Sequence, residues 1–341
     1  MAAGRLRIAT YNVEWFHALF ADDGRPLTDA QCSARQTVTR GEQIAALGHV
    51  FRALDADAVL VVEAPDISRN RNRAVALANF ADAAGLRARE VAFGFANDTR
   101  QELMLLYDPG VITARHDPLD RGAPRFDTAY RIDLGIDATE DVVVFSKPPL
   151  ELALDTPLGP MRMIGVHVKS KAPHGARDAD HAMKIAIANR RKQLAQCIWL
   201  RRRITAHLAA GEALVVLGDL NDGPGLDIHE ALFGRSGVEI VMGWGEGPGG
   251  LMYDPHAAKA LDRRIVAAPT TARFYIASEG RYLSALLDYV MVSPGLRPAA
   301  RHWRVWHPFE DPGCWDDAAL RAALLAASDH FPVTLDLSAE G

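Results

Sequence analysis

Residues 213–221 read ALVVLGDLN, a run of apolar and β-branched residues that ends in Gly218, Asp219 and Asn221. The apolar part has the length and composition of a buried β-strand, whereas Gly, Asp and Asn are residues that end strands and form turns. The segment predicts a buried strand that carries a carboxylate and an amide to one edge of a sheet. Those two groups are either a plain turn or part of a site.

Short apolar runs of the same kind recur along the chain and predict further strands. They are LRIATYNV (6–13), AVLVVEA (58–64), VVVFS (142–146), MRMIGVHV (161–168), LLDYVMVS (286–293) and VTLDL (333–337). Between them, residues 41–54 and about 180–208 have the apolar spacing of amphipathic helices. Because strands and helices do not alternate regularly, we expect two packed sheets covered by helices. We expect one domain over residues 1–341, with FSKPPL (145–150) as a turn between strands.

Composition excludes several classes of protein. The chain has 341 residues and a formal net charge of −5, with 38 basic and 43 acidic residues, so it lacks a global nucleic-acid signature. Its three cysteines are far apart and predict neither a disulfide framework nor a zinc site. The HExxH, GxSxG and P-loop motifs are absent. With no signal peptide and no apolar run of membrane-spanning length, we expect a cytoplasmic protein.

Polar side chains recur at the ends or starts of the predicted strands. In antiparallel sheets one rim collects the ends of some strands and the starts of their neighbours, so these side chains could gather on one rim. The candidates are Asn12, Glu63, His167 with Lys169 two residues on, Asp219 with Asn221, Asp288, and Asp329 with His330.

Taken singly, most candidates have an ordinary structural interpretation. Asn12 could be a turn residue, His167 a hydrogen-bonded core histidine, and residues 218–224 only a turn. Asp288 is harder to explain in this way, because an unpaired carboxylate in an apolar strand costs several kcal/mol or shifts its pKa. It needs a partner, and a histidine such as His330 is a natural one.

Taken together, the residue types suit the hydrolysis of a phosphate ester. Glu63 and Asp329 offer the hard oxygen ligands that Mg²⁺ or Mn²⁺ prefers. Asp219 beside Asn221 offers a base for water and an amide to orient it, and His167 offers a donor for developing phosphate charge. This set fits metal-assisted hydrolysis.

The motifs resemble the endonuclease/exonuclease/phosphatase superfamily, which includes deoxyribonucleases, apurinic endonucleases, sphingomyelinases and inositol-polyphosphate phosphatases. The resemblance covers nearly the whole chain, and its motifs occur in the order found in the family. The NVEWF and HVKSK variants look closest to bacterial members described only as endonuclease/exonuclease/phosphatase-like proteins. The motifs are TYNVEWF (10–16), the strand ending in Glu63, HVKSK (167–171), GDLND (218–222), LDYVMVS (287–293) and SDHFPV (328–333).

This resemblance implies an α+β fold, a four-layer αββα sandwich of two mixed, mainly antiparallel sheets with the site at one rim. It implies that Glu63 binds an essential divalent metal, Mg²⁺ or else Mn²⁺ or Ca²⁺. Asn12 and Asp329 would complete or support the metal's shell. The Val62–Glu63–Ala64 context departs from the Gln-Glu pair of many relatives, which alters the surroundings of the ligand more than the ligand.

The resemblance also implies roles in the reaction. Asp219 would position or deprotonate the attacking water, aided by Asn221. His330, held by Asp288, would contact the scissile phosphate, and His167 would do so from the opposite side or assist the leaving oxygen. The source of the leaving oxygen's proton stays open at this point.

Lys169 and Arg100 are further positions expected to contact the phosphate. The insertion-like KAPHGARDADHAMK (171–184) is either a substrate-contacting loop or a solvated surface loop. The basic segments 190–192 and 201–203 are either phosphate contacts or the charged outer face of a helix.

We therefore expect a divalent-metal-dependent phosphodiesterase, foremost a nuclease with a nucleic-acid partner. The alternatives are a phosphomonoesterase or phospholipase that acts on a small-molecule or lipid phosphate, and an inactive binding module. The sequence identifies no protein partner. A pseudoenzyme should have lost an acid or a histidine of the set, and none is missing.

Overall fold

The computed structural model describes residues 4–65, 73–97, 99, 101–134, 140–173, 175–225, 230–247, 249–262, 268–276 and 280–339. Among these residues, no helix combines the length and the apolar character needed to cross a membrane.

The first sheet has six strands in the order β14-β15-β1-β2-β4-β3. β1 runs parallel to β2, and the other neighbouring pairs are antiparallel. The predicted strands at 6–13, 58–64 and 333–337 are present here, to within one residue at each end. The strands are β1 (Arg5–Asn12), β2 (Ala58–Pro65), β3 (Glu90–Phe93), β4 (Gln101–Tyr107), β14 (Ala300–Val305) and β15 (Val333–Ser338).

The second sheet has five strands in the order β13-β10-β9-β8-β5. β10 runs parallel to β9, and the other pairs are antiparallel. The segment ALVVLGD is its strand β10, fully buried as its composition predicts. The strands are β5 (Thr113–His116), β8 (Leu150–Thr156), β9 (Gly159–His167), β10 (Leu214–Asp219) and β13 (Asp288–Val292).

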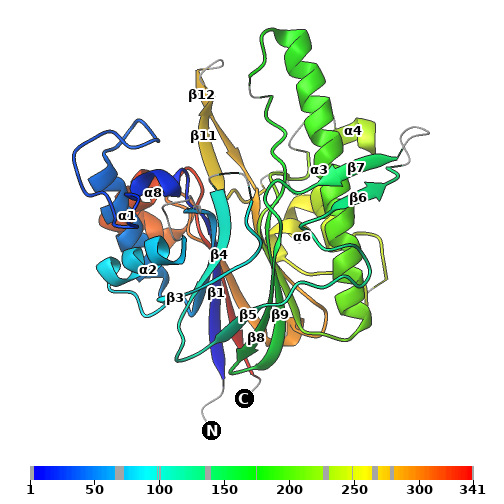
Figure 1. Ribbon diagram of the computed structural model, residues 1–341, viewed down its shortest axis with the longest axis horizontal. Helices are drawn as coiled ribbons and strands as arrows, with labels where there is room; N and C mark the ends of the chain where they lie inside the picture. Colours follow the sequence, from blue (N-terminus) through cyan, green and yellow to red (C-terminus); the bar gives the residue numbers. More distant parts are fainter. Residues whose placement is uncertain are drawn as a thin grey trace.

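Helices cover the outer faces of both sheets, which lie face to face (Figure 1). The inner core joins side chains of the two sheets, such as Ile8 and Leu60 from one and Met163 and Val215 from the other. Helices α1, α2 and α8 pack on the outer face of the first sheet. Helices α3, α5 and α6 pack on the outer face of the second. The predicted four-layer αββα sandwich with mixed sheets is thus confirmed.

Both predicted helices are present. Thr39 caps α1 and forms a capping box with Glu42, and the side chain of Asp178 caps α3. The α-helices are α1 (Arg40–Leu54), α2 (Arg73–Ala84), α3 (Ala179–Ala209), α4 (Glu230–Phe233), α5 (Gly237–Met242), α6 (Pro255–Leu261), α7 (Pro312–Asp316) and α8 (Ala318–Ala327). Two 3₁₀ turns are η1 (Phe16–Leu19) and η2 (Arg297–Ala299).

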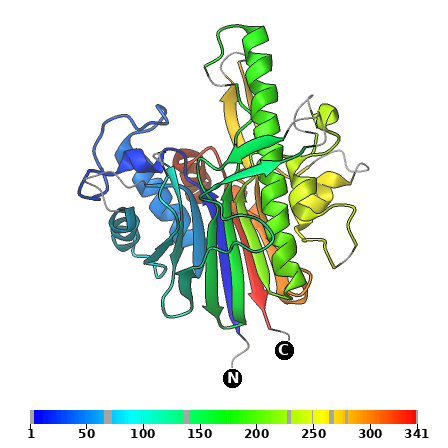
Figure 2. The ribbon, with the colours of Figure 1, turned by 45° about the vertical axis from the view of Figure 1, so that its right-hand side comes forward.

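Two hairpins lie outside the main sheets: β6 (Ala129–Ile132) with β7 (Asp141–Val144), and β11 (Ala272–Ile276) with β12 (Arg281–Ala285). The predicted strand at 142–146 is β7, so it belongs to a hairpin, and FSKPPL connects it to β8. The hairpin β11–β12 and the first turns of α3 both project beyond the same end of the sandwich (Figures 1 and 2).

Candidate active site

The strand registers bring most of the predicted polar residues to one rim. In the second sheet His167 and Asp288 are the register partners of Asp219 on its two sides. In the first sheet Asn12 pairs with Val62, which places Glu63 at the same end. The parallel pairs β1–β2 and β9–β10 therefore end at the rim, while antiparallel β13 begins there.

A cleft of about 650 Å³ lies at this rim. Most of the predicted site residues line it, and Asp288 lies behind the others with 2% of its surface exposed. The predicted residues in the lining are Asn12, Glu63, His167, Lys169, Asp219, Asn221, Asp329 and His330. Arg100 lies outside the described residues, as does His174 of the 171–184 segment.

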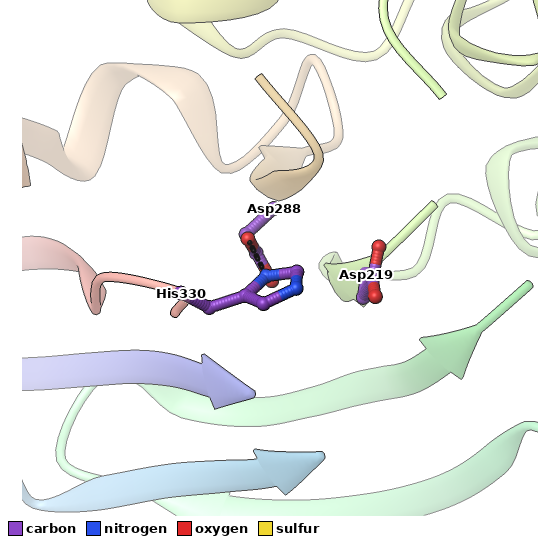
Figure 3. Close-up of side chains that lie close together, drawn as sticks. All are labelled: Asp219, Asp288 and His330. Carbon is purple, nitrogen blue, oxygen red and sulfur yellow. Dashed lines mark hydrogen bonds and ion pairs between the residues drawn. The ribbon is translucent and has the colours of Figure 1, made fainter. Parts of the chain in front are cut away.

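His330 and Asp288 form a buried pair (Figure 3). The two groups are 2.7 Å apart, Nδ1 of His330 to Oδ2 of Asp288, and the Thr271 hydroxyl donates to the same oxygen at 2.9 Å. Burial by itself lowers the pKa of His330, but the charges of Asp288 and Asp219 and the hydrogen bond outweigh it. The pKa of His330 therefore lies well above its ordinary value, and the ring is an oriented imidazolium.

Three donors hold the Asp219 carboxylate. The Asn221 backbone N–H donates to Oδ1 at 2.6 Å, while the amides of Asn12 and Asn221 donate to Oδ2 at 3.0 and 3.1 Å. Burial and the nearby Asp288 raise the pKa of Asp219 to about 7, against the effect of His330 and these donors. Its carboxylate can thus exchange a proton near neutral pH.

Gly218 sets the position of this acid. Its φ is 127°, and a Cβ there would lie 2.1 Å from the carbonyl oxygen of Val166 on the neighbouring strand. Glycine is the residue that permits this close approach. In the Gly218–Asp219 pair, packing therefore requires the glycine, and the aspartate that follows supplies the carboxylate at the rim.

His167 faces Asp219 from the other side, with Nε2 3.6 Å from Oδ2. The Lys147 ammonium lies 3.1 Å from Nδ1 of His167 and donates to Oε1 of Gln101 at 2.5 Å. Burial, then the charges of Lys147 and His330, holds the pKa of His167 well below its ordinary value. His167 is therefore a neutral imidazole, in contrast to His330.

Glu63 sits at a break in the β2–β4 register with a φ of 63°, in the left-handed region that a glutamate rarely adopts. Gln101 donates to Oε2 of Glu63, as does the Trp15 backbone N–H at 3.4 Å. Burial raises the pKa of Glu63, and Asp329 adds to that effect. The bulge thus turns a strand carboxylate into the cleft.

The donor set on this side of the cleft fits a hard divalent cation. Glu63 and Asp329 supply carboxylate oxygens, and Asp329 has no side-chain hydrogen bond to any described residue. Oδ1 of Asn12 is buried and has no partner within the described chain. A buried acceptor without a donor beside two acids is what a cation, or water held by one, would satisfy.

A second acidic group, Asp219 with Asp288 and His330, has ligand atoms within 4.8 Å of one another. Nδ1 of His330 is already bound to Asp288, and the raised pKa keeps the ring protonated. A protonated imidazole is a poor metal ligand. We interpret this group as a hydrogen-bonded charge network, and the site of Glu63 and Asp329 as the cation site.

Five polar residues of the cleft were not predicted: Glu14, Gln101, Ser146, Lys147 and Ser170. Glu14 bonds Arg35, and burial and Asp329 raise its pKa to about 7. Glu14 lies within the TYNVEWF motif and was the easiest to find. Gln101 and Lys147 carry no signal in the sequence, because one begins a strand and the other lies in a Pro-rich turn.

A sandwich of this kind, with acids, amides and two histidines at one rim, is consistent with a phosphoesterase. The chain belongs to the Endonuclease/Exonuclease/phosphatase family, whose model matches residues 9–330. Members of this family are phosphate-ester hydrolases that typically use divalent metals. A search of the curated proteins finds no match.

Solved structures share the fold at low sequence identity. TDP2 from C. elegans is 12% identical with a TM-score of 0.51, covering 98% of this chain and 75% of that one. D. rerio TDP2 complexed with single strand DNA product is 10% identical with a TM-score of 0.50, covering 97% and 98%. ANGEL2, a 2',3'-cyclic phosphatase, in complex with adenosine-2',3'-vanadate, is 11% identical with a TM-score of 0.51, covering 100% and 97%.

Proposed function

We propose that the protein is a Mg²⁺-dependent phosphodiesterase that hydrolyses nucleic acid. The observation that carries the proposal is one cleft holding a carboxylate with a near-neutral pKa, Asp219, between an imidazolium, His330, and a neutral imidazole, His167. A base for water flanked by two donors for phosphate oxygens matches the needs of phosphodiester hydrolysis. Mn²⁺ is the expected substitute metal.

The reaction begins with a water beside Asp219. The three donors to its carboxylate fix its orientation, and Asn221 also donates to the Val168 carbonyl at 3.0 Å, which anchors the turn. Asp219 takes a proton from the water as its oxygen bonds to phosphorus. The phosphorus–oxygen bond to the leaving group then breaks, and solvent in the open cleft protonates the leaving oxygen.

Charge builds on the phosphate oxygens as the water attacks. His330 donates from Nε2, because Nδ1 is bound to Asp288, and the imidazolium charge is already in place before the reaction. His167 donates from Nε2 on the other side. Glu63, Asp329 and Asn12 would hold the cation, which adds positive charge at the same phosphate when bound.

Two features support nucleic acid over a lipid headgroup. Aromatic side chains of Trp15 and Phe274 line the cleft, and Trp15 is 43% exposed, so planar bases have surfaces on which to stack. A structural relative is a TDP2 bound to a single strand DNA product. Trp15 also has a left-handed backbone with a φ of 57°, uncommon for an aromatic residue.

The test is hydrolysis of single- and double-stranded DNA, RNA, bis-p-nitrophenyl phosphate, an inositol phosphate and sphingomyelin with Mg²⁺, Mn²⁺ or Ca²⁺. We expect cleavage of a nucleic acid that EDTA abolishes and Mg²⁺ restores, with Asp219→Asn losing at least about 10²-fold in turnover. The matched control is Asp127→Asn, an exposed acid that pairs with Arg125. Cleavage of sphingomyelin alone, or full activity in EDTA, contradicts the proposal.

A further inference from the structure

The lysines of this chain are not spread evenly. The chain has 38 basic residues but only six lysines, and five of them fall between residues 147 and 192. They are Lys147, Lys169, Lys171, Lys184 and Lys192, and the sixth is Lys259 on α6. Arg supplies the cations elsewhere, and several arginines form ion pairs such as Arg203–Glu151 and Arg7–Asp336.

Two of these lysines are brought together by the packing of α3 on the rim. Lys169 lines the cleft two residues after His167, and its backbone N–H donates to Oε1 of Gln196 at 2.8 Å. Lys192 lies four residues before Gln196 on α3, so both share one helix face. Asn189, on that face too, donates to the carbonyl of Ala172 at 3.0 Å. The face of α3 that carries Lys192 therefore lies against the loop that carries Lys169.

The two lysines differ from their neighbours in having no counter-charge. Lys171 pairs with the buried Asp222, and Lys147 bonds Gln101 and His167. Within the described part of the chain, neither the Lys169 nor the Lys192 ammonium has a hydrogen bond or an acidic partner. Two half-buried cations without an acid repel one another, and an anion between them would relieve that repulsion.

The pKa shifts of the cleft residues also indicate that Lys169 and Lys192 lie close together. Burial lowers the pKa of Lys169, and the charge of Lys192 lowers it further. The charge of Lys169 in turn lowers the pKa values of Lys147 and His167. Positive charge thus extends from the predicted position of the scissile phosphate out to α3.

We propose that Lys169 and Lys192 form a second phosphate subsite, which binds a non-scissile phosphate of a polynucleotide. The proposal rests on the proposed function, because the scissile phosphate must lie between His167 and His330. A strand carries a phosphate at every nucleotide, so its next phosphate falls beside the first. The first turns of α3 project beyond the rim on this side, which gives a longer strand a wall to follow (Figure 1).

The experiment compares two substrates in the presence of Mg²⁺: a single-stranded oligonucleotide, and bis-p-nitrophenyl phosphate, which has only the scissile phosphate. We expect Lys192→Gln to lower the ratio of the two kcat/KM values roughly tenfold, as befits the loss of one charged hydrogen bond. The salt dependence of oligonucleotide kcat/KM should weaken by about 0.7 in log–log slope. The double variant with Lys169→Gln should lose more.

Lys259→Gln is the matched control, because this exposed lysine lies on α6 and should change neither the ratio nor the slope. An unchanged ratio and slope in Lys192→Gln, or an equal loss on both substrates, overturns the subsite. If Lys192→Gln lowered kcat/KM for an inositol polyphosphate as much as for the oligonucleotide, the assignment of the subsite to a polynucleotide would be overturned.

If the wild-type protein cleaves neither substrate, the proposed function fails, and binding decides the subsite by itself. Fluorescence anisotropy then measures the binding of a phosphorothioate oligonucleotide in EDTA to the wild type, Lys192→Gln and Lys259→Gln. Weaker binding by Lys192→Gln than by Lys259→Gln supports the subsite, and equal binding overturns it.

Discussion

The ammonium of Lys147 lies 3.1 Å from Nδ1 of His167. An ammonium has only donors, so Nδ1 must accept and the ring proton of His167 must be on Nε2. That proton points toward Asp219 and the cleft. We therefore propose that His167 acts as a donor to substrate and not as a general base, a role that the sequence left open.

Lys147→Met should raise the pKa of His167, because the lysine charge is one of the causes that lower it. The measurement is a ¹³C-edited NMR titration of the ring, with the signal assigned through His167→Gln. Lys147→Arg keeps the positive charge and serves as the control. An unchanged titration in Lys147→Met would show that the two groups do not interact in solution.

His330 and Asp288 should behave as one unit in catalysis. Because Asp288 orients and charges the ring, the double variant His330→Gln/Asp288→Asn should be little worse in kcat/KM than the more damaging single one. Thr271, which donates to Asp288, gives a milder variant: Thr271→Val should lose less than either. Additive losses in the double variant would separate the two roles.

The pH profile of kcat/KM should be bell-shaped. Asp219 has a pKa of about 7 and acts as a carboxylate, so activity should rise with pH through that value. His330 acts when protonated and has a raised pKa, so activity should fall at higher pH as the ring loses its proton. Asp288→Asn removes a cause of that raised pKa, so the alkaline limb should move to lower pH. A limb that stays in place contradicts the assignment.

Cation affinity should depend on the carboxylates assigned to it. Glu63→Gln and Asp329→Asn should each weaken Mn²⁺ binding by about tenfold or more, measured by isothermal titration calorimetry without substrate. Glu42→Gln, an exposed acid in the first turn of α1, is the control and should bind Mn²⁺ as the wild type does. If Asp288→Asn alone abolished binding, the cation would belong to the other acidic group.

Stability should depend on the buried pair that fastens α3 to the second sheet. Arg203 is fully buried and reaches both oxygens of Glu151 on β8, at 2.5 and 2.7 Å. Arg203→Met removes the guanidinium that neutralises a buried carboxylate and should lower the free energy of unfolding by about 3–5 kcal/mol in urea titrations. Arg125→Met breaks an exposed pair and should cost under about 1 kcal/mol. Equal losses would contradict this difference.

The layers of the fold and the pairing of His330 with Asp288 were predictable for a clear reason. Apolar runs with polar ends indicate which segments are buried, and this predicts the strands of the sheets. The same pattern places Asp288 in a buried strand, where its carboxylate needs a partner such as His330. Asp219 at the end of β10 follows from the same pattern.

The contribution of Lys147 was not predictable, because it depends on how the turn after β7 packs beside the end of β9. Gln101 contacts Glu63 because Glu63 lies at a bulge and has a left-handed φ, and the periodicity of the sequence does not reveal that bulge. Tertiary packing determines the positions of such residues, and the surrounding sequence does not indicate those positions.

The termini give this protein a convenient orientation. Arg5 pairs with Ser338, and β1 runs from Arg5 to Asn12 at the cleft, so both ends of the chain leave from the pole opposite the rim (Figure 1). A fusion partner, an affinity tag or a surface linker attached at either end would therefore leave the cleft facing outward. Immobilised molecules would present their open side to a long substrate in solution, which suits this protein to single-molecule measurements.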